Sequence, residues 1–143
     1  MVKRITFLLL VFIVISCKKE KVNGIIIGDT LFVHQSLSEN QKMEKLIYQA
    51  LKKDKSAIIG ITNFPNGGAA SSYDLGFVLT QIIYRIGEND FANILREIPK
   101  SEQNEIEGLI AVGLEYGDND YDGQMDNKRM ETEFPKLNEI LNE

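Results

Sequence analysis

The chain has 143 residues, of which 43% are hydrophobic and 26% are charged, and its formal net charge is −5 at pH 7. A chain of this length supports one domain with a modest hydrophobic core. Its acidic balance argues against a nucleic-acid-binding protein, because contacts to phosphates need clustered Lys and Arg side chains. No nucleic acid is therefore expected among its partners.

The first seventeen residues have the order of segments that is typical of a secretory signal. Lys3 and Arg4 give a positive start, and a mostly apolar run follows over residues 5–15. A helix over this run would rise only about 16 Å, whereas the hydrocarbon core of a bilayer is roughly 30 Å thick. A membrane-spanning anchor is therefore disfavoured, and export with or without lipidation remains.

Val14-Ile15-Ser16-Cys17 resembles the lipobox of bacterial lipoproteins, although leucine is commoner where Val14 stands. In that family the cysteine is diacylated, with fatty chains such as palmitate, and the segment before it is cleaved off. The resemblance implies a signal peptide over residues 1–16 and lipidation at Cys17. It also implies a protein of the cell envelope that is anchored in a membrane by its N-terminal lipid, on the periplasmic or the surface side.

Cleavage would remove two positive charges and change the net charge from −5 to −7. Residues 17–24 are interpreted as a lipidated tether, because charged residues after the acylated cysteine are poor core residues and Gly24 ends the stretch. Whether the lysines of this tether contact anionic headgroups or only solvent stays open. Residues 25–143 are expected to form a single helical domain.

Apolar residues recur at helical spacing through most of this domain. The exception is residues 25–33, where β-branched residues surround Gly28-Asp29 and indicate a short β-hairpin or an extended arm. Ser38 and Gln41 have the spacing of a capping box, which predicts the start of the first helix. Residues 56–64 fit a short buried helix or a strand, and a helix packed on the previous one is favoured.

Further helical patterns cover residues 71–86, 89–98, 101–116 and 132–141. Gly108 and Gly113 lower helix propensity, so they are predicted to mark close contacts between helices. Pro135 is tolerated only in the first turn of the last helix. About five packed helices in helical hairpins predict an all-α fold.

One segment has the D-x-D-x-D-G pattern of calcium-binding loops. The resemblance implies that the ligands are Asp118, Asp120, Asp122, the main-chain carbonyl of Gln124, and Asp126 directly or through water. The pattern departs from the EF-hand at the twelfth position, where Arg129 replaces a bidentate glutamate. The alternative is that these residues only form turns, through side-chain hydrogen bonds to the main chain. Calcium is the one cofactor that the sequence suggests, and both interpretations stay open.

Tyr73 and Asp74 are candidate binding residues, because they are assigned to a loop over residues 65–74, and loops on rigid helices often carry recognition. His34, the only histidine, is interpreted as structural. No nucleophile–base set, HExxH motif or cofactor fingerprint occurs in the sequence, so no catalytic residue is assigned.

The sequence therefore favours a non-catalytic interaction module that binds a protein or another envelope component. The alternative is a small envelope hydrolase that uses Asp or Glu carboxylates, because so acidic a chain does not exclude a catalytic pair.

Overall fold

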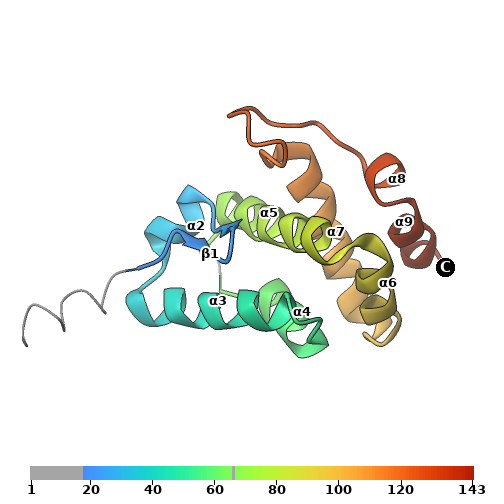
Figure 1. Ribbon diagram of the computed structural model, residues 1–143, viewed down its shortest axis with the longest axis horizontal. Helices are drawn as coiled ribbons and strands as arrows, with labels where there is room; N and C mark the ends of the chain where they lie inside the picture. The colour runs from blue at the N-terminus through green and yellow to red at the C-terminus, as the bar shows by residue number, and fades with distance from the viewer. Residues whose placement is uncertain (1–17, 66) are drawn as a thin grey trace, which may run out of the picture.

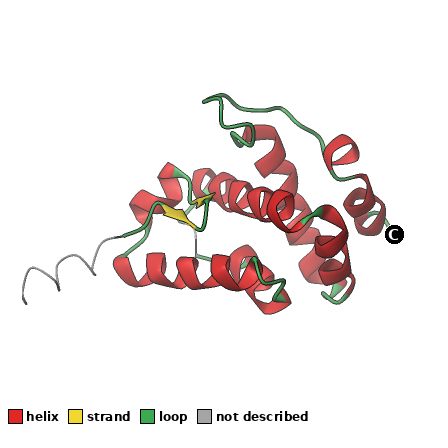
Figure 2. Ribbon diagram, in the orientation of Figure 1, coloured by secondary structure: helices red, strands yellow, loops and turns green. Residues whose placement is uncertain are grey.

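The computed structural model describes residues 18–65 and 67–143, and over these residues the fold is all-α with one small hairpin (Figures 1 and 2). The expected fold class is confirmed. The proposed signal peptide and Cys17 lie outside the described residues. The elements in chain order are β1 (Lys21–Val22), β2 (Ile25–Ile26), α2 (Asp29–His34), α3 (Leu37–Ala50), α4 (Lys55–Thr62), α5 (Ala69–Ile86), α6 (Glu88–Arg96), α7 (Lys100–Tyr116), α8 (Met130–Glu133) and α9 (Pro135–Leu141).

Helix α5 is the centre of the fold, and every residue from Leu75 to Ile83 is buried. Helix α7 packs along it, while α3 and α4 lie on one side and α6, α8 and α9 gather near its C-terminal end (Figure 1). Gly113 lies at the contact between α5 and α7, as predicted. Gly108 does not, because a Cβ atom there would meet nothing within 4 Å. No helix among the described residues combines the length and apolar character needed to cross a bilayer.

The structure corrects the expected tether for residues 18–24. The N–H of Lys19 donates to Asn40 Oδ1 at 2.6 Å, and Val22 is only 5% exposed within the core. Strands β1 and β2 pair in antiparallel register, with Val22 opposite Ile25. This segment is therefore part of the folded body.

The hairpin lies earlier than the expected position near residues 25–33. Its turn is Asn23-Gly24, where both residues have positive φ (49° and 89°). Asn-Gly is a strong signal for a two-residue hairpin turn, because these residues accept that conformation at low cost. Residues 29–33, which were expected to belong to the hairpin or extended arm, are part of α2 instead. This helix has no side-chain cap of its own, and the N–H of Leu31 donates to Asp74 of α5 at 2.7 Å.

The first predicted helix is present as α3, but its cap is Ser36 rather than Ser38. Ser36 and Glu39 form the capping box, since the N–H of Ser36 donates to Glu39 Oε2 at 2.7 Å and Ser36 Oγ accepts the N–H of Glu39 at 3.3 Å. Helix α4 confirms the helical interpretation of residues 56–64.

The helix expected over residues 132–141 is divided into α8 and α9. The break is at Phe134, whose φ and ψ are −136° and 63° and whose side chain is buried. Pro135 then begins α9, the position where its missing N–H costs no helical hydrogen bond.

Candidate functional site

The surface over α5 and α7 carries an exposed pair of stacked tyrosines. The rings of Tyr73 and Tyr116 have centroids 4.8 Å apart and planes inclined by 19°, and each residue is 42% exposed. Stacking in this geometry contributes about 0.5–1.5 kcal/mol and so restrains the two side chains. Tyr73 belongs to the second turn of α5 and not to the loop before it, so the pair stands on two rigid helices.

Two hollows flank Tyr73. One of about 370 Å³ lies over α4, α5 and α7, where Asn104 and Glu105 line it and the missing side chain of Gly108 leaves room. The other, of about 290 Å³, is lined by residues that include Asp74, Tyr116 and Asp118. The structure thus brings the candidate residues Tyr73 and Asp74 close to Asp118, the first residue of the acidic loop over residues 118–126.

Asp74 also stabilises the contact between α2 and α5. Burial raises the pKa of its carboxyl above the ordinary value of 3.8, and the charge of Asp29 adds to this, while hydrogen bonds from the main chain of Leu31 and Thr30 oppose it. A Cβ atom on Gly28 would lie 2.1 Å from Asp74 Oδ1, so only glycine allows this approach. Asp74 therefore holds α2 on α5.

The acidic loop between α7 and α8 uses two of its carboxylates to form turns. Asp118 accepts the N–H groups of Asp122 and Gly123, at 2.8 and 3.0 Å. Asp122 accepts the N–H of Gln124 at 2.9 Å. These are the side-chain-to-main-chain bonds of the turn interpretation.

The remaining two carboxylates are paired with Lys128. Its Nζ atom lies 2.5 Å from Asp120 Oδ1 and 3.6 Å from Asp126 Oδ2, and Asp126 also accepts the N–H of Asn119 at 2.7 Å. Burial opposes the charge of Lys128, but the hydrogen bond to Asp120 and the charge of Asp126 outweigh it and raise its pKa.

In this conformation the loop does not fit a calcium ion. The described residues contain no group of three or more His, Cys, Asp or Glu side chains placed to hold a metal. Calcium binding would require Lys128 to move away from Asp120. The calcium interpretation therefore stays a prediction, and the proposed function does not depend on it.

Asn119 was not singled out by the sequence, yet it fixes the acidic loop on the helices. Its Nδ2 donates to the carbonyl of Gly113 at 3.0 Å, and its Oδ1 accepts the hydroxyl of Thr80 at 2.7 Å. Tyr116 was missed in the same way. No local sequence pattern identifies Asn119 or Tyr116, because the role of each residue depends on how α5 and α7 cross.

Comparison of the chain with known protein families, with curated proteins and with solved structures gives no match in any of the three.

Proposed function

We propose that the chain is a bacterial lipoprotein, held in a membrane of the cell envelope by lipid on Cys17, and that its body is a non-catalytic binding module. The anchoring part rests on the sequence resemblance at Val14-Ile15-Ser16-Cys17. On this proposal the body lies close to the membrane, because Lys19, two residues after the lipid, is already bonded to Asn40.

The observation that carries the binding part is the stacked, exposed pair of Tyr73 and Tyr116 between two hollows. Tyrosine is enriched at binding surfaces, because it offers a large amphipathic contact area. Here the pair has little freedom left to lose on binding, since it is stacked and mounted on helices. The partner on this proposal is a protein or another component of the envelope.

The test is cross-linking of the full chain in intact cells, followed by identification of what it captures. We expect a partner with the wild-type chain and its loss in a Tyr73→Ala/Tyr116→Ala variant. Tyr48→Ala is the matched control, because Tyr48 is similarly exposed (49%) but lies on α3. Equal capture by all three chains would contradict the proposed surface.

The hydrolase alternative is tested with the same purified chain in a broad screen of hydrolase substrates. We expect no turnover. Turnover that is lost on replacement of a single carboxylate by its amide would contradict the non-catalytic proposal.

A further inference from the structure

The charge of the chain is divided unevenly along its length. Residues 18–55 contain eight Lys and five Asp or Glu residues, whereas residues 56–143 contain six Lys or Arg and sixteen Asp or Glu residues. The first part, which includes the hairpin, α2 and α3, is therefore net positive, and the rest is strongly negative. The basic part of this acidic chain is the part that directly follows the proposed lipid anchor.

The positive charge gathers on the outer side of α3, which is turned away from the core. The buried residues of this helix, which mark its inner side, are Asn40, Met43, Ile47 and Ala50. Lys42 and Lys45 are exposed and lie outside this stripe. Lys52 is also exposed, and it follows the helix where its N–H still donates to the carbonyl of Gln49 at 2.9 Å. Seven residues, about two helical turns, separate it from Lys45, so both lie on one side. Lys42, Lys45 and Lys52 are called the basic face below.

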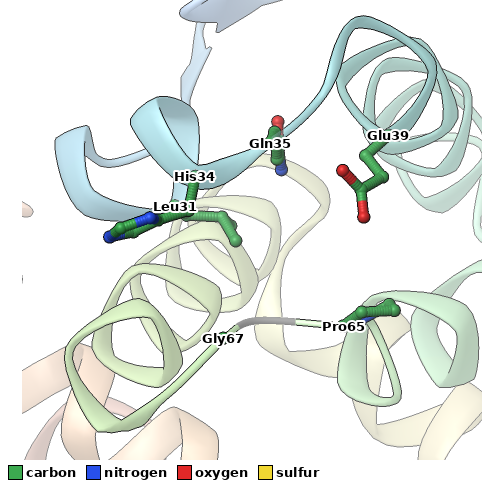
Figure 3. A pocket seen from close by; sticks show the side chains of 6 residues that line it. All are labelled: Leu31, His34, Gln35, Glu39, Pro65 and Gly67. Atoms are coloured by element: carbon green, nitrogen blue, oxygen red, sulfur yellow. The ribbon is translucent and has the colours of Figure 1, made fainter.

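The carboxylates of α3 do not neutralise the basic face by ion pairs. Glu39, in the first turn, directs its carboxylate toward the cavity between α2, α3 and Pro65 (Figure 3) and accepts the N–H of Ser36 at 2.7 Å. Glu44 forms an ion pair with Lys19 instead. The ion pairs between described residues include none of the three lysines of the basic face.

The first described residues determine how far the proposed lipid lies from this helix. Lys18 Nζ donates to the carbonyl of Phe32 at 2.6 Å, and the N–H of Lys19 donates to Asn40 of α3 at 2.6 Å. Neighbouring Cα atoms are about 3.8 Å apart, so a lipid on Cys17 would follow directly on a residue that is bonded to the fold. A link of one residue cannot hold the body away from the bilayer.

We propose that the basic face of α3 lies on the anionic lipid headgroups of the membrane that holds the anchor. This rests on the proposed lipid at Cys17, which brings the face to the bilayer. The phosphates of anionic lipids attract Lys side chains, and each lysine near the surface raises the docked population about fivefold. The unpaired charge of the face thus has a partner of complementary charge within reach.

This orientation also agrees with the position of the acidic loop. Figure 1 shows α3 and the loop between α7 and α8 on opposite sides of the molecule, with α5 between them. A bilayer at the basic face therefore lies far from the carboxylates of the loop, which anionic headgroups would repel. Tyr116 is the last residue of α7, at the base of this loop, so the proposed binding surface stays open.

The test uses the full chain as cells process it, reconstituted in vesicles of phosphatidylglycerol or of phosphatidylcholine. The chain contains no tryptophan, so a single introduced tryptophan reports its own depth through quenching by lipids brominated near the headgroup. Gln41→Trp places the reporter on the exposed side of α3. Met125→Trp is the matched control, because Met125 is 63% exposed but belongs to the acidic loop. We expect quenching of Gln41→Trp in phosphatidylglycerol, less in phosphatidylcholine, and none of Met125→Trp in either.

Charge reversal tests the lysines themselves. Lys45→Glu/Lys52→Glu, made in the Gln41→Trp chain, should lower the docked population about thirtyfold or more, the effect of two lysines. Arg96→Glu/Lys136→Glu makes the same change in net charge on α6 and α9 and should leave the quenching as it was. A measurement without charge reversal is made in about 1 M salt, where the screening length falls to about 3 Å and the quenching should fall.

The proposal is overturned if Gln41→Trp is not quenched in phosphatidylglycerol, or if Gln41→Trp and Met125→Trp are quenched equally. It is also overturned if both charge-reversed chains behave alike or if salt has no effect. The mass of the purified chain shows separately whether Cys17 carries lipid. Lipid without quenching contradicts only the basic face, whereas quenching without lipid contradicts only the anchor.

Discussion

Gly76 on α5 and Gly113 on α7 touch through their main chains. A Cβ atom built on Gly113 would lie 2.2 Å from the carbonyl oxygen of Gly76, and one on Gly76 would lie 2.8 Å from the nitrogen of Gly113. Tyr73 precedes Gly76 by three residues and Tyr116 follows Gly113 by three, so each tyrosine shares the face of its glycine. The close crossing of the two helices therefore brings the two rings into contact.

The first prediction concerns this crossing. Gly113→Ala should lower the free energy of unfolding by about 1–3 kcal/mol or more, because the new methyl group meets main-chain atoms that cannot turn aside. Gly108→Ala, on the same helix, should be neutral or stabilise by up to about 1 kcal/mol through helix propensity, since its Cβ meets nothing. Urea denaturation measures both. Equal losses for the two variants would contradict the account of the crossing.

The second prediction compares two buried glutamines. Gln103→Leu should destabilise the fold by about 2 kcal/mol, because the carbonyls of Leu95 and Ile98 lose the N–H groups that Gln103 donates, although Leu95 keeps the N–H of Ile98. Gln35→Leu should cost less than about 1 kcal/mol, since it removes an unsatisfied donor and Asn40 keeps its bonds to Lys19. Both values come from urea titrations. A larger loss for Gln35→Leu would show that Gln35 has a partner in solution.

The third prediction is a pH dependence. Burial raises the pKa of Asp74 above 3.8, so the folded chain keeps this proton to a higher pH than the unfolded chain does. The stability contributed by Asp74 is therefore complete below about pH 3.8 and falls as the pH rises through the folded pKa. Asp74→Asn still offers an oxygen to Leu31 but cannot ionise, so it should lack this fall.

Urea unfolding of both chains over about pH 3 to 7 measures the difference. The free energy of unfolding of the wild type, relative to Asp74→Asn, should decrease with rising pH. A relative increase would mean that the carboxylate is stabilised in the fold.

The fourth prediction concerns the acidic loop. If calcium binds, it must compete with Lys128 for Asp120 and Asp126, so Lys128→Met should enlarge the rise in Tm that calcium causes. The measurement is a melt of each chain with calcium and with a chelator. An Asp120→Ala/Asp122→Ala variant should lose the response. If calcium changes the Tm of none of these chains, the carboxylates of the loop only form turns and ion pairs.

The sequence predicts features that local chemistry determines. Apolar spacing locates α3 to α7, and Pro135 correctly marks a helix start. The small shifts have local causes too: Ser36 and Glu39 compete with Ser38 and Gln41 for the capping box, and the real pair also has the reciprocal side-chain bond. Asn23-Gly24 is a local turn signal that the sequence contains, and it predicts the hairpin once the segment is not assigned to a tether.

Other features depend on contacts that no local pattern contains. Helix α2 has only six residues, and Asp74, distant in sequence, supports it. Gly108 and Gly113 look alike in the sequence, yet only Gly113 faces Gly76. The orientation of the Gln35 amide depends on Asn40, which is itself held by Lys19, twenty-one residues away. Tertiary packing decides such features, so they are visible only in the fold.

The lipid anchor at Cys17 is tested by metabolic labelling with palmitate combined with fractionation of cells. We expect the wild-type chain to take up label and to sediment with the envelope, and Cys17→Ser to lose both. The proposed anchor is contradicted if neither chain takes up label and Cys17→Ser still sediments with the envelope.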